Sequence, residues 1–247
     1  MPVRKITKSM AEEWAAQRSG ERSARTYNYE RESLIRVLDY AQREGLILDN
    51  PARILQRLKL RQVKPTIPTK AEFETLLVEI GKLRSDARAS AELCELLAYS
   101  GCRLREGTAL TWGDVDFKKK QFTVTGGERG TKNHEARTIP LFPSLEAFLK
   151  RLLDEMEKPP RSEQRISKIE SAKKAMMSAC KKADLPHFTH HHLRHFFCSN
   201  TIEVGIDFKA IAGWLGHKDG GLLVAKTYGH LRDEHSAEMA KRMTYGV

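Results

Sequence analysis

The sequence predicts a mainly α-helical protein with a small antiparallel β-sheet, in which a small all-helical domain precedes a larger α+β domain. Apolar residues recur at helical spacing over most of the chain, whereas only residues 121–125 and 135–141 show the short patterns typical of strands. An aperiodic segment with two prolines, residues 62–68, separates two periodic regions. We therefore expect a helical domain at 1–61, a linker at 62–68 and an α+β domain at 69–247.

Two amphipathic helices are expected in the N-terminal domain. Thr7 can cap a helix that runs to about Arg18, and Ser23 can cap a longer helix that runs through Glu44. Asn50-Pro51 ends the helical pattern. The longer helix carries apolar residues at helical spacing, namely Tyr27, Leu34, Val37, Leu38 and Ala41.

The α+β domain is expected to open with two helices and a sharp turn. Thr69 and Glu72 form a capping-box pair at the start of the first helix. Residues 91–100 are strongly apolar and predict a buried second helix, which Gly101 can end in a left-handed conformation. Arg103 is therefore expected just past the end of a buried helix.

A glycine-rich connection is expected to join the two strands into a hairpin. The strands are residues 121–125 and 135–141, and the connection between them spans residues 126–133. This connection carries two cationic side chains, Arg129 and Lys132.

From Ser144 onward the chain is expected to be mostly helical, with two helical stretches around Pro159-Pro160 within residues 150–182. Shorter helices follow, and the junctions between them hold His217 and Tyr228. The expected shorter helices are residues 191–203, 207–216, 221–228 and 233–244.

The charge of the chain indicates a polyanionic partner. The formal net charge is +11 at pH 7 and the isoelectric point is near 9.5. The chain shows neither a signal-peptide pattern nor an apolar run long enough to cross a membrane, so nucleic acid is favoured over a membrane surface. Residues 1–68 carry 14 Lys and Arg against 8 Asp and Glu, which makes the N-terminal domain a plausible DNA clamp.

The cysteines and histidines raise the question of a metal site. Cys94, Cys102, Cys180 and Cys198 are widely spaced without a CxxC pair, which indicates buried thiols in a reducing cytoplasm. A metallonuclease is an alternative because imidazole and thiolate bind zinc, but the carboxylates that accompany phosphoesterase metals are absent from the histidine-rich stretch. We expect no metal. The candidate ligands are His187, His190, His191, His192, His195 and Cys198.

Short segments far apart in the chain supply groups suited to chemistry at a phosphodiester. Arginine presents a planar fork of donors to phosphate oxygens, histidine transfers a proton near neutral pH, and a tyrosine oxygen can carry a covalent phosphoryl group. Such a set needs no metal ion. The segments are Gly101–Glu106 with Arg103, His191–His195 with Arg194, Leu215–His217, and Thr227–His230 with Tyr228.

The motif order R…HxxR…LGH…Y resembles the tyrosine recombinases, the family of phage integrases and chromosome-dimer resolvases, over roughly residues 69–235. The resemblance implies a site-specific recombinase that cleaves and rejoins double-stranded DNA through a 3′-phosphotyrosine, without a cofactor. It also implies a tetramer on paired DNA sites, accessory DNA-bending proteins, and a bacterial nucleoid or phage-encoded setting. Residues 23–51 are similar to the latter half of the family's core-binding domain, but the preceding stretch is short, so a partial domain is expected.

The resemblance assigns roles to the groups that bind the phosphate. Arg103 and Arg194 are implied to bind the nonbridging oxygens of the scissile phosphate, and His217 to hydrogen-bond a phosphate oxygen. Glu106, one helical turn after Arg103, is implied to support the site rather than to contact DNA.

The general base is implied to be a histidine of the second segment. His191 lies three residues before Arg194, so both side chains share one face of a helix and can reach the same phosphate. His192 and His195 are the next candidates, although His195 is better explained as a neutral core histidine.

The nucleophile and the general acid also have first candidates and alternatives. Tyr228, eleven residues beyond the third-motif histidine, is the implied nucleophile, ahead of Tyr99 and Tyr245. Lys132 is the implied general acid toward the leaving 5′ oxygen, and Arg129 on the same connection is the alternative.

Two other functions use nearly the same sequence features. A type IB topoisomerase would relax DNA with nearly the same residues, and an integrase-derived DNA-binding protein or fragment would bind DNA without recombining it. The length of the chain and the LGH motif favour the recombinase.

Overall fold

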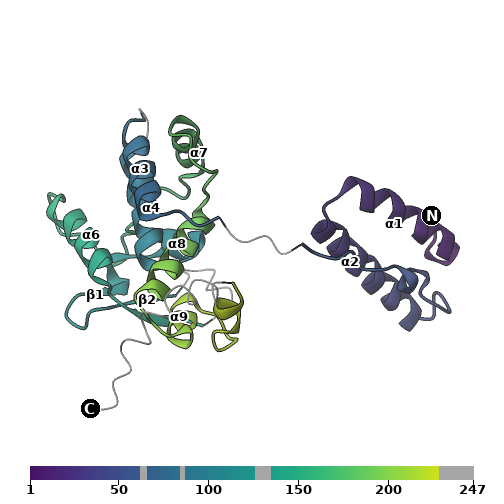
Figure 1. The fold of residues 1–247 in the computed structure, drawn as a ribbon. Coiled ribbons are helices and arrows are strands. Elements are labelled where there is room, and N and C mark those ends of the chain that lie inside the picture. Colours follow the sequence, from purple (N-terminus) through teal and green to yellow (C-terminus); the bar gives the residue numbers. More distant parts are fainter. Residues whose placement is uncertain (62–65, 84–86, 126–134, 228–247) are drawn as a thin grey trace, which may run out of the picture. The chain divides into compact units, whose positions relative to one another are not determined.

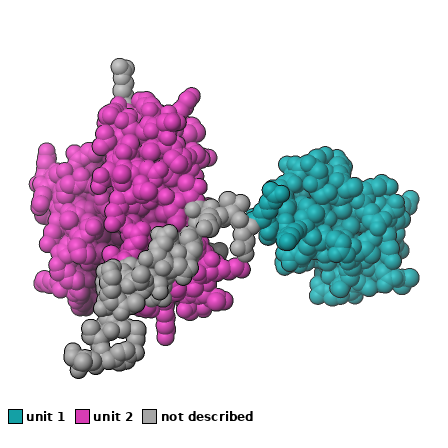
Figure 2. Space-filling view, in the orientation of Figure 1, with its two compact units in different colours: residues 1–63 teal, residues 64–247 magenta. Residues whose placement is uncertain are grey.

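The structure is a computed structural model and describes residues 1–61, 66–83, 87–125 and 135–227. The chain divides into two units, Met1–Val63 (unit 1) and Lys64–Val247 (unit 2), shown in Figure 2. Helices dominate both units, and unit 2 adds a three-stranded antiparallel sheet (Figure 1), so the predicted fold class is confirmed. No helix in the described ranges is both long and apolar enough to span a membrane.

Unit 1 contains the two expected helices, α1 (Lys8–Glu21) and α2 (Ala24–Arg43). The Thr7 hydroxyl accepts a hydrogen bond from the Met10 amide at 3.2 Å, and the Ser23 hydroxyl accepts one from the Thr26 amide at 3.2 Å. Both predicted N-caps are confirmed, and α1 ends three residues later than expected. A 3-10 helix, η1, covers Val3–Lys5, and another, η2, covers Pro51–Ile54.

Side-chain hydrogen bonds to the backbone compensate for the small core of unit 1. Nδ2 of Asn28 donates to the Leu58 carbonyl at 2.8 Å, and Oδ1 of Asn28 accepts from the backbone amide of Leu58 at 2.8 Å. Val37 was expected on the apolar face of α2 but is 63% exposed, because the two-helix unit buries only one side of α2. The buried hydrophobic residues of unit 1 are Ala11, Tyr27, Leu38, Ala41, Ala52 and Leu55.

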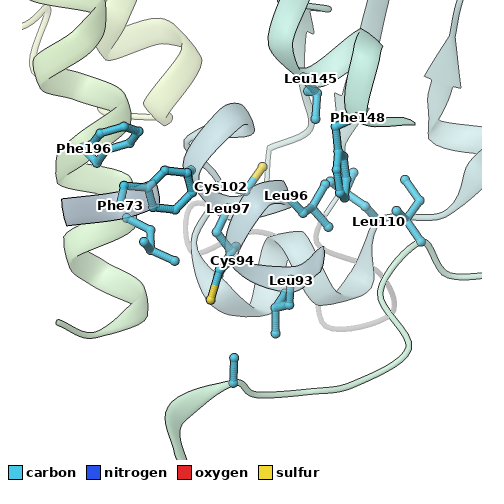
Figure 3. Packing of buried hydrophobic residues seen from close by; sticks show 14 of the residues in the cluster. Phe73, Leu93, Cys94, Leu96, Leu97, Cys102, Leu110, Leu145, Phe148 and Phe196 are labelled. Carbon is cyan, nitrogen blue, oxygen red and sulfur yellow. The ribbon is translucent and has the colours of Figure 1, made fainter. Parts of the chain in front are cut away.

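The core of unit 2 surrounds α4 (Ala87–Ser100), which packs against α3 (Lys70–Gly81), α6 (Pro143–Asp154) and α8 (His190–Glu203). Figure 3 shows apolar side chains of α4 among the aromatic rings of these neighbours. The predicted Thr69–Glu72 capping box is confirmed. Unit 2 also contains α5 (Leu104–Ala109), η3 (Trp112–Asp114), α7 (Lys173–Lys182) and α9 (Phe208–Leu215).

The buried helix α4 begins four residues earlier than the expected start at 91. Arg88 donates to Glu92 at 2.7 Å across one helical turn, and this i, i+4 pair supports the additional turn. Gly101 ends the helix with φ +66°, so the predicted left-handed termination is confirmed.

The sheet has the order β1–β2–β3, with strands Val115–Asp116, Gln121–Val124 and Arg137–Pro140. The two expected strands pair antiparallel, with Phe122 opposite Ile139 and Val124 opposite Arg137. Strand β1 was not expected from the sequence, because two residues carry no periodic pattern and form a strand only by pairing with β2. The predicted hairpin connection, residues 126–133, lies outside the described residues.

The segment between α6 and α7 differs most from expectation. The prediction placed helical stretches around Pro159-Pro160, but α6 ends at Asp154 and α7 begins at Lys173. Instead, the Gly113 amide donates to the Ser162 carbonyl at 2.7 Å and the Ile166 amide donates to the Leu110 carbonyl at 2.9 Å. These tertiary hydrogen bonds replace helical ones, and prolines cannot supply the amide donors that a helix needs.

The later helices agree closely with expectation. Helices α8 and α9 begin and end within one residue of the expected ranges, and residues 222–227 are helical. The expected helix at 233–244 lies outside the described residues.

Replacing Gly101 by alanine is expected to destabilise unit 2 by about 2–4 kcal/mol. An added Cβ would lie 2.5 Å from Cδ1 of Phe197, and the positive φ disfavours any L side chain. The free energy of unfolding in urea measures the effect. Gly81→Ala is the control, because no heavy atom lies within 4 Å of an added Cβ there. Equal stability of Gly101→Ala and the wild type would contradict this prediction.

Candidate active site

The first motif is a turn that presents Arg103 beside a buried carboxylate. Arg103 is the N-cap of α5, and Glu106 at the third helical position accepts from the Arg103 amide at 2.9 Å. Glu106 also accepts from Nη1 of Arg103 at 2.9 Å. The Glu106 side chain is only 4% exposed, whereas that of Arg103 is 29% exposed. The buried carboxylate therefore fixes the guanidinium of Arg103, and part of the guanidinium side chain still faces solvent.

The second motif places Arg194 on α8 in the interior of unit 2. Its side chain is 6% exposed. Nη1 donates to the Gly101 carbonyl at 2.8 Å, and Nη2 donates to the Leu215 carbonyl at 2.6 Å. Burial and the nearby charge of Arg103 lower the pKa of Arg194 to about 10, so the guanidinium still carries its charge at neutral pH.

The third motif follows the C-terminal end of α9. Gly216 caps this helix with φ +65°, and the turn brings Nε2 of His217 to 3.1 Å from Nη2 of Arg194. Nη1 of Arg103 lies 3.5 Å from the Leu215 carbonyl oxygen, which Arg194 also contacts. Arg103, Arg194 and His217, which come from three distant segments, therefore converge on one helix end.

His217 is neutral in this arrangement. Burial, followed by the charges of Arg194 and Arg103, lowers the pKa of His217. A guanidinium only donates hydrogen bonds, so Nε2 of His217 accepts and the ring hydrogen lies on Nδ1. Nδ1 is buried and has no hydrogen-bond partner among the described residues.

Arg137, at the start of β3, is a part of this site that the sequence analysis did not identify. Its Nη2 donates to Glu106 at 2.7 Å, and its Nε donates to the Trp214 carbonyl at 2.7 Å. Burial by itself raises the pKa of Glu106, but the hydrogen bond and charge of Arg137, followed by hydrogen bonds from Arg103, lower it to about 2. The signal in the sequence is Glu106 itself, because a carboxylate that supports the site without contacting DNA needs a cationic partner, and that partner can be more distant in sequence than Arg103 and Arg105.

The histidines of α8 have different surroundings. His191 is exposed, and its ring contacts the ring of His195 edge to face at a centroid distance of 4.5 Å. Partial desolvation, followed by the charge of Arg194, lowers the pKa of His191. This pKa direction keeps the imidazole neutral and able to accept a proton.

The alternative bases are engaged elsewhere. Nδ1 of His192 accepts from the Thr189 amide at 2.8 Å and so caps α8. Burial, followed by the neighbouring His191, lowers the pKa of His195 to about 4, which fits a neutral packed ring. Nε2 of His190 accepts from the Ala172 amide at 3.0 Å. Across the described part of the chain, no three His, Cys, Asp or Glu side chains are grouped so that they could hold a metal ion.

A family model of the phage integrase family matches residues 68–235. The chain belongs to the phage integrase family. The predicted family, the tyrosine recombinases, is thereby confirmed. The predicted function class is confirmed as well: this integrase is an enzyme of site-specific recombination that cleaves and rejoins DNA.

The integrase is similar to tyrosine recombinases from bacteria and archaea. It is 26% identical to the tyrosine recombinase XerD of Neisseria meningitidis over 208 residues, and this alignment covers 79% of this chain and 69% of that protein. It is 28% identical to the tyrosine recombinase XerA of Pyrococcus furiosus over 209 residues, and this alignment covers 82% of this chain and 70% of that protein.

Solved integrase structures share the fold. The Tn1549 transposon integrase in complex with circular intermediate DNA matches with a TM-score of 0.72 at 22% identity, covering 97% of this chain and 86% of that one. A lambda integrase tetramer bound to a Holliday junction matches with a TM-score of 0.69 at 20% identity, covering 89% of this chain and 66% of that one.

The integrase has an open pocket of about 150 Å³ where these motifs meet. At this pocket Lys218 donates to Glu135 at 2.6 Å. Arg103, Arg137 and Lys218 outnumber the single acidic side chain, Glu135, so the lining of this open pocket carries a net positive charge. The pocket is lined by Arg103, Glu135, Ala136, Arg137, Gly213, Gly216, His217 and Lys218.

The structure describes only one of the candidate nucleophiles, Tyr99, and neither of the candidate general acids. Lys132, Arg129, Tyr228 and Tyr245 lie outside the described residues. Tyr99 is half-buried between the rings of Phe73 and Phe148, at centroid distances of 6.0 and 6.3 Å, and burial raises its pKa. A high pKa and a packed ring both disfavour Tyr99 as the nucleophile.

Proposed function

We propose that this integrase cleaves a strand of double-stranded DNA by attack of the Tyr228 oxygen on the scissile phosphate. The attack forms a 3′-phosphotyrosine and breaks the bond to the 5′ oxygen, which leaves with a proton. A 5′-hydroxyl then attacks the phosphotyrosine, the bond between phosphorus and the Tyr228 oxygen breaks, and the strand is rejoined as the tyrosine regains its proton. The convergence of Arg103, Arg194 and His217 at the end of α9 carries this proposal.

The two arginines are suited to stabilise the transition state. Negative charge accumulates on the nonbridging oxygens of the pentavalent phosphorus, and donors fixed beforehand need no reorganisation during the reaction. The Gly101 and Leu215 carbonyls hold the guanidinium of Arg194 in place, and Glu106 holds that of Arg103. Glu106 thus supports the site without contacting DNA.

The proton transfers are assigned to two different side chains. A neutral His191 accepts the proton of the Tyr228 hydroxyl, and its lowered pKa keeps it in the accepting form at neutral pH. Lys132 donates the proton to the leaving 5′ oxygen. The phosphotyrosine conserves the energy of the broken bond, so strand rejoining requires no nucleotide cofactor.

Unit 1 is proposed to act as a partial core-binding clamp on DNA. Its excess of basic residues favours the phosphate backbone. We further propose that the integrase assembles as a tetramer on paired DNA sites, aided by accessory DNA-bending proteins, in a bacterial nucleoid or phage-encoded setting. The solved lambda integrase tetramer on a Holliday junction supports this assembly as a model.

Covalent trapping tests the proposed reaction. The full chain is incubated with a nicked suicide DNA substrate, from which the short fragment that carries the new 5′-hydroxyl diffuses away, and the mixture is separated on a denaturing gel. A covalent protein–DNA adduct that forms equally well with and without EDTA is expected. Binding without an adduct would indicate a DNA-binding protein, and site-independent relaxation of supercoils by the monomer would indicate a topoisomerase.

Lys132→Ala is expected to form the adduct on the order of 10²-fold more slowly on ordinary DNA. On DNA with a 5′-bridging phosphorothiolate, the sulfur leaves without needing a proton, so this variant should recover most of the wild-type rate. Arg129→Ala is the matched control on the same connection and should show neither effect. Equal slowness of Lys132→Ala on both substrates would mean that another group is the acid.

A further inference from the structure

Arg137 connects three parts of the chain that meet at the proposed phosphate site. It begins β3, contacts Glu106 of the first motif, and contacts the Trp214 carbonyl next to the third motif. All three guanidinium nitrogens are used, because Nη1 also donates to Glu106 at 3.3 Å. The side chain is 12% exposed, so these hydrogen bonds form largely away from water.

We propose that Arg137 is a positioning residue that locks the third-motif turn onto the Arg103–Glu106 pair before DNA binds. The inference rests on the proposed function of this site and adds a residue that sequence reasoning did not assign. Arg137 acts through Glu106 and the turn at Leu215–His217, not through contact with the phosphate.

The shape of the third-motif turn supports this role. A Cβ on Gly216 would lie 3.0 Å from Nη1 and 3.2 Å from Cζ of Arg137. The glycine thus leaves room for the guanidinium, in addition to allowing the positive φ of the turn. The residue that follows it is His217, so a shift of Arg137 is transmitted directly to the histidine.

Charge balance gives Arg137 a second effect on the site. Glu106 lies 2.9 Å from Nη1 of Arg103, 2.7 Å from Nη2 of Arg137 and 4.0 Å from Nη1 of Arg194. Arg137 supplies the shortest of these ion pairs and neutralises the carboxylate. Without it, the buried Glu106 would attract Arg103 and Arg194 more strongly and compete with the phosphate for them.

Arg137→Lys tests the proposal, because lysine keeps the charge but cannot form the three-way hydrogen bonds. We expect adduct formation at saturating protein to slow by about 10-fold or more, while the dissociation constant for DNA changes by less than about threefold. Hydrogen exchange should increase in residues 213–218 and stay unchanged in the peptide from α4. Arg151→Lys is the matched control, since Arg151 also pairs with a helix carboxylate, Glu95, at 2.7 Å.

A double-mutant cycle shows whether Arg137 acts through Glu106. In a Glu106→Gln background, Arg137→Lys should slow the reaction by less than about threefold. Gly216→Ala places a Cβ against the guanidinium of Arg137 and should likewise increase hydrogen exchange in residues 213–218. Unchanged rates in Arg137→Lys, or fully additive effects in the cycle, would overturn the proposal.

The failures of the two proposals are distinguishable. If the wild type forms no adduct, the proposed function fails, and the exchange measurement alone still decides whether Arg137 holds the turn. If Arg137→Lys and Gly216→Ala both lose the folded state, as judged by circular dichroism, Arg137 holds the fold rather than the site, and the positioning role is wrong.

Discussion

Replacement of Tyr228 by phenylalanine is expected to abolish the covalent adduct, while DNA binding changes by less than about twofold. Only the nucleophilic oxygen is removed, and without it no bond to phosphorus can form. The measurement is the amount of adduct on a denaturing gel with the suicide substrate, together with the dissociation constant from a gel-shift titration.

Two other tyrosines serve as matched controls for this result. Tyr99→Phe should leave the adduct intact, because the ring packs between two phenylalanines and burial raises the pKa of its hydroxyl. Tyr245→Phe should also leave it intact. An adduct formed by Tyr228→Phe but absent from one of the other two variants would move the nucleophile to that tyrosine.

Arg194→Ala is expected to slow adduct formation by a factor on the order of 10² or more, which corresponds to roughly 2.7 kcal/mol in the barrier. The substitution removes a guanidinium that is fixed by two carbonyl groups and also contacts Nε2 of His217. Single-turnover rates at saturating protein separate this effect from DNA binding. Arg194→Lys should remain severely slow, since an ammonium cannot present two parallel donors.

The control for Arg194 must separate chemistry from general loss of positive charge. Arg165→Ala removes a cation that pairs with Glu170 and whose side chain is 58% exposed. This variant should cleave at a rate within about twofold of wild type once DNA is saturating. If Arg194→Ala cleaves as fast as this control, Arg194 does not stabilise the transition state. The phosphorothiolate substrate should not rescue Arg194→Ala, because its defect is in charge stabilisation and not in proton transfer.

Local sequence signals predicted most of the secondary structure. The caps at Thr7, Ser23 and Thr69 and the left-handed Gly101 depend on hydrogen bonds and dihedral angles within a few residues, so the sequence alone reveals them. Strand β1 was not predictable, because its two residues carry no periodic pattern and pair with β2 across a tight turn. The course of residues 155–172 was not predictable either, because it is set by hydrogen bonds to residues 110–113, which are distant in the chain.

The motif order by itself determined the family and the chemistry: two arginines, two histidines and a tyrosine in this order are suited to a phosphodiester and to little else. Only the tertiary structure decided which groups surround them. It showed that Arg103 and Arg194 share the Leu215 carbonyl, and that Arg137 pairs with Glu106 across 31 residues of sequence. Motif spacing reports which side chains share a helix face. The partners of a buried charge depend on how the helices and strands pack, and no single segment of the sequence determines that packing.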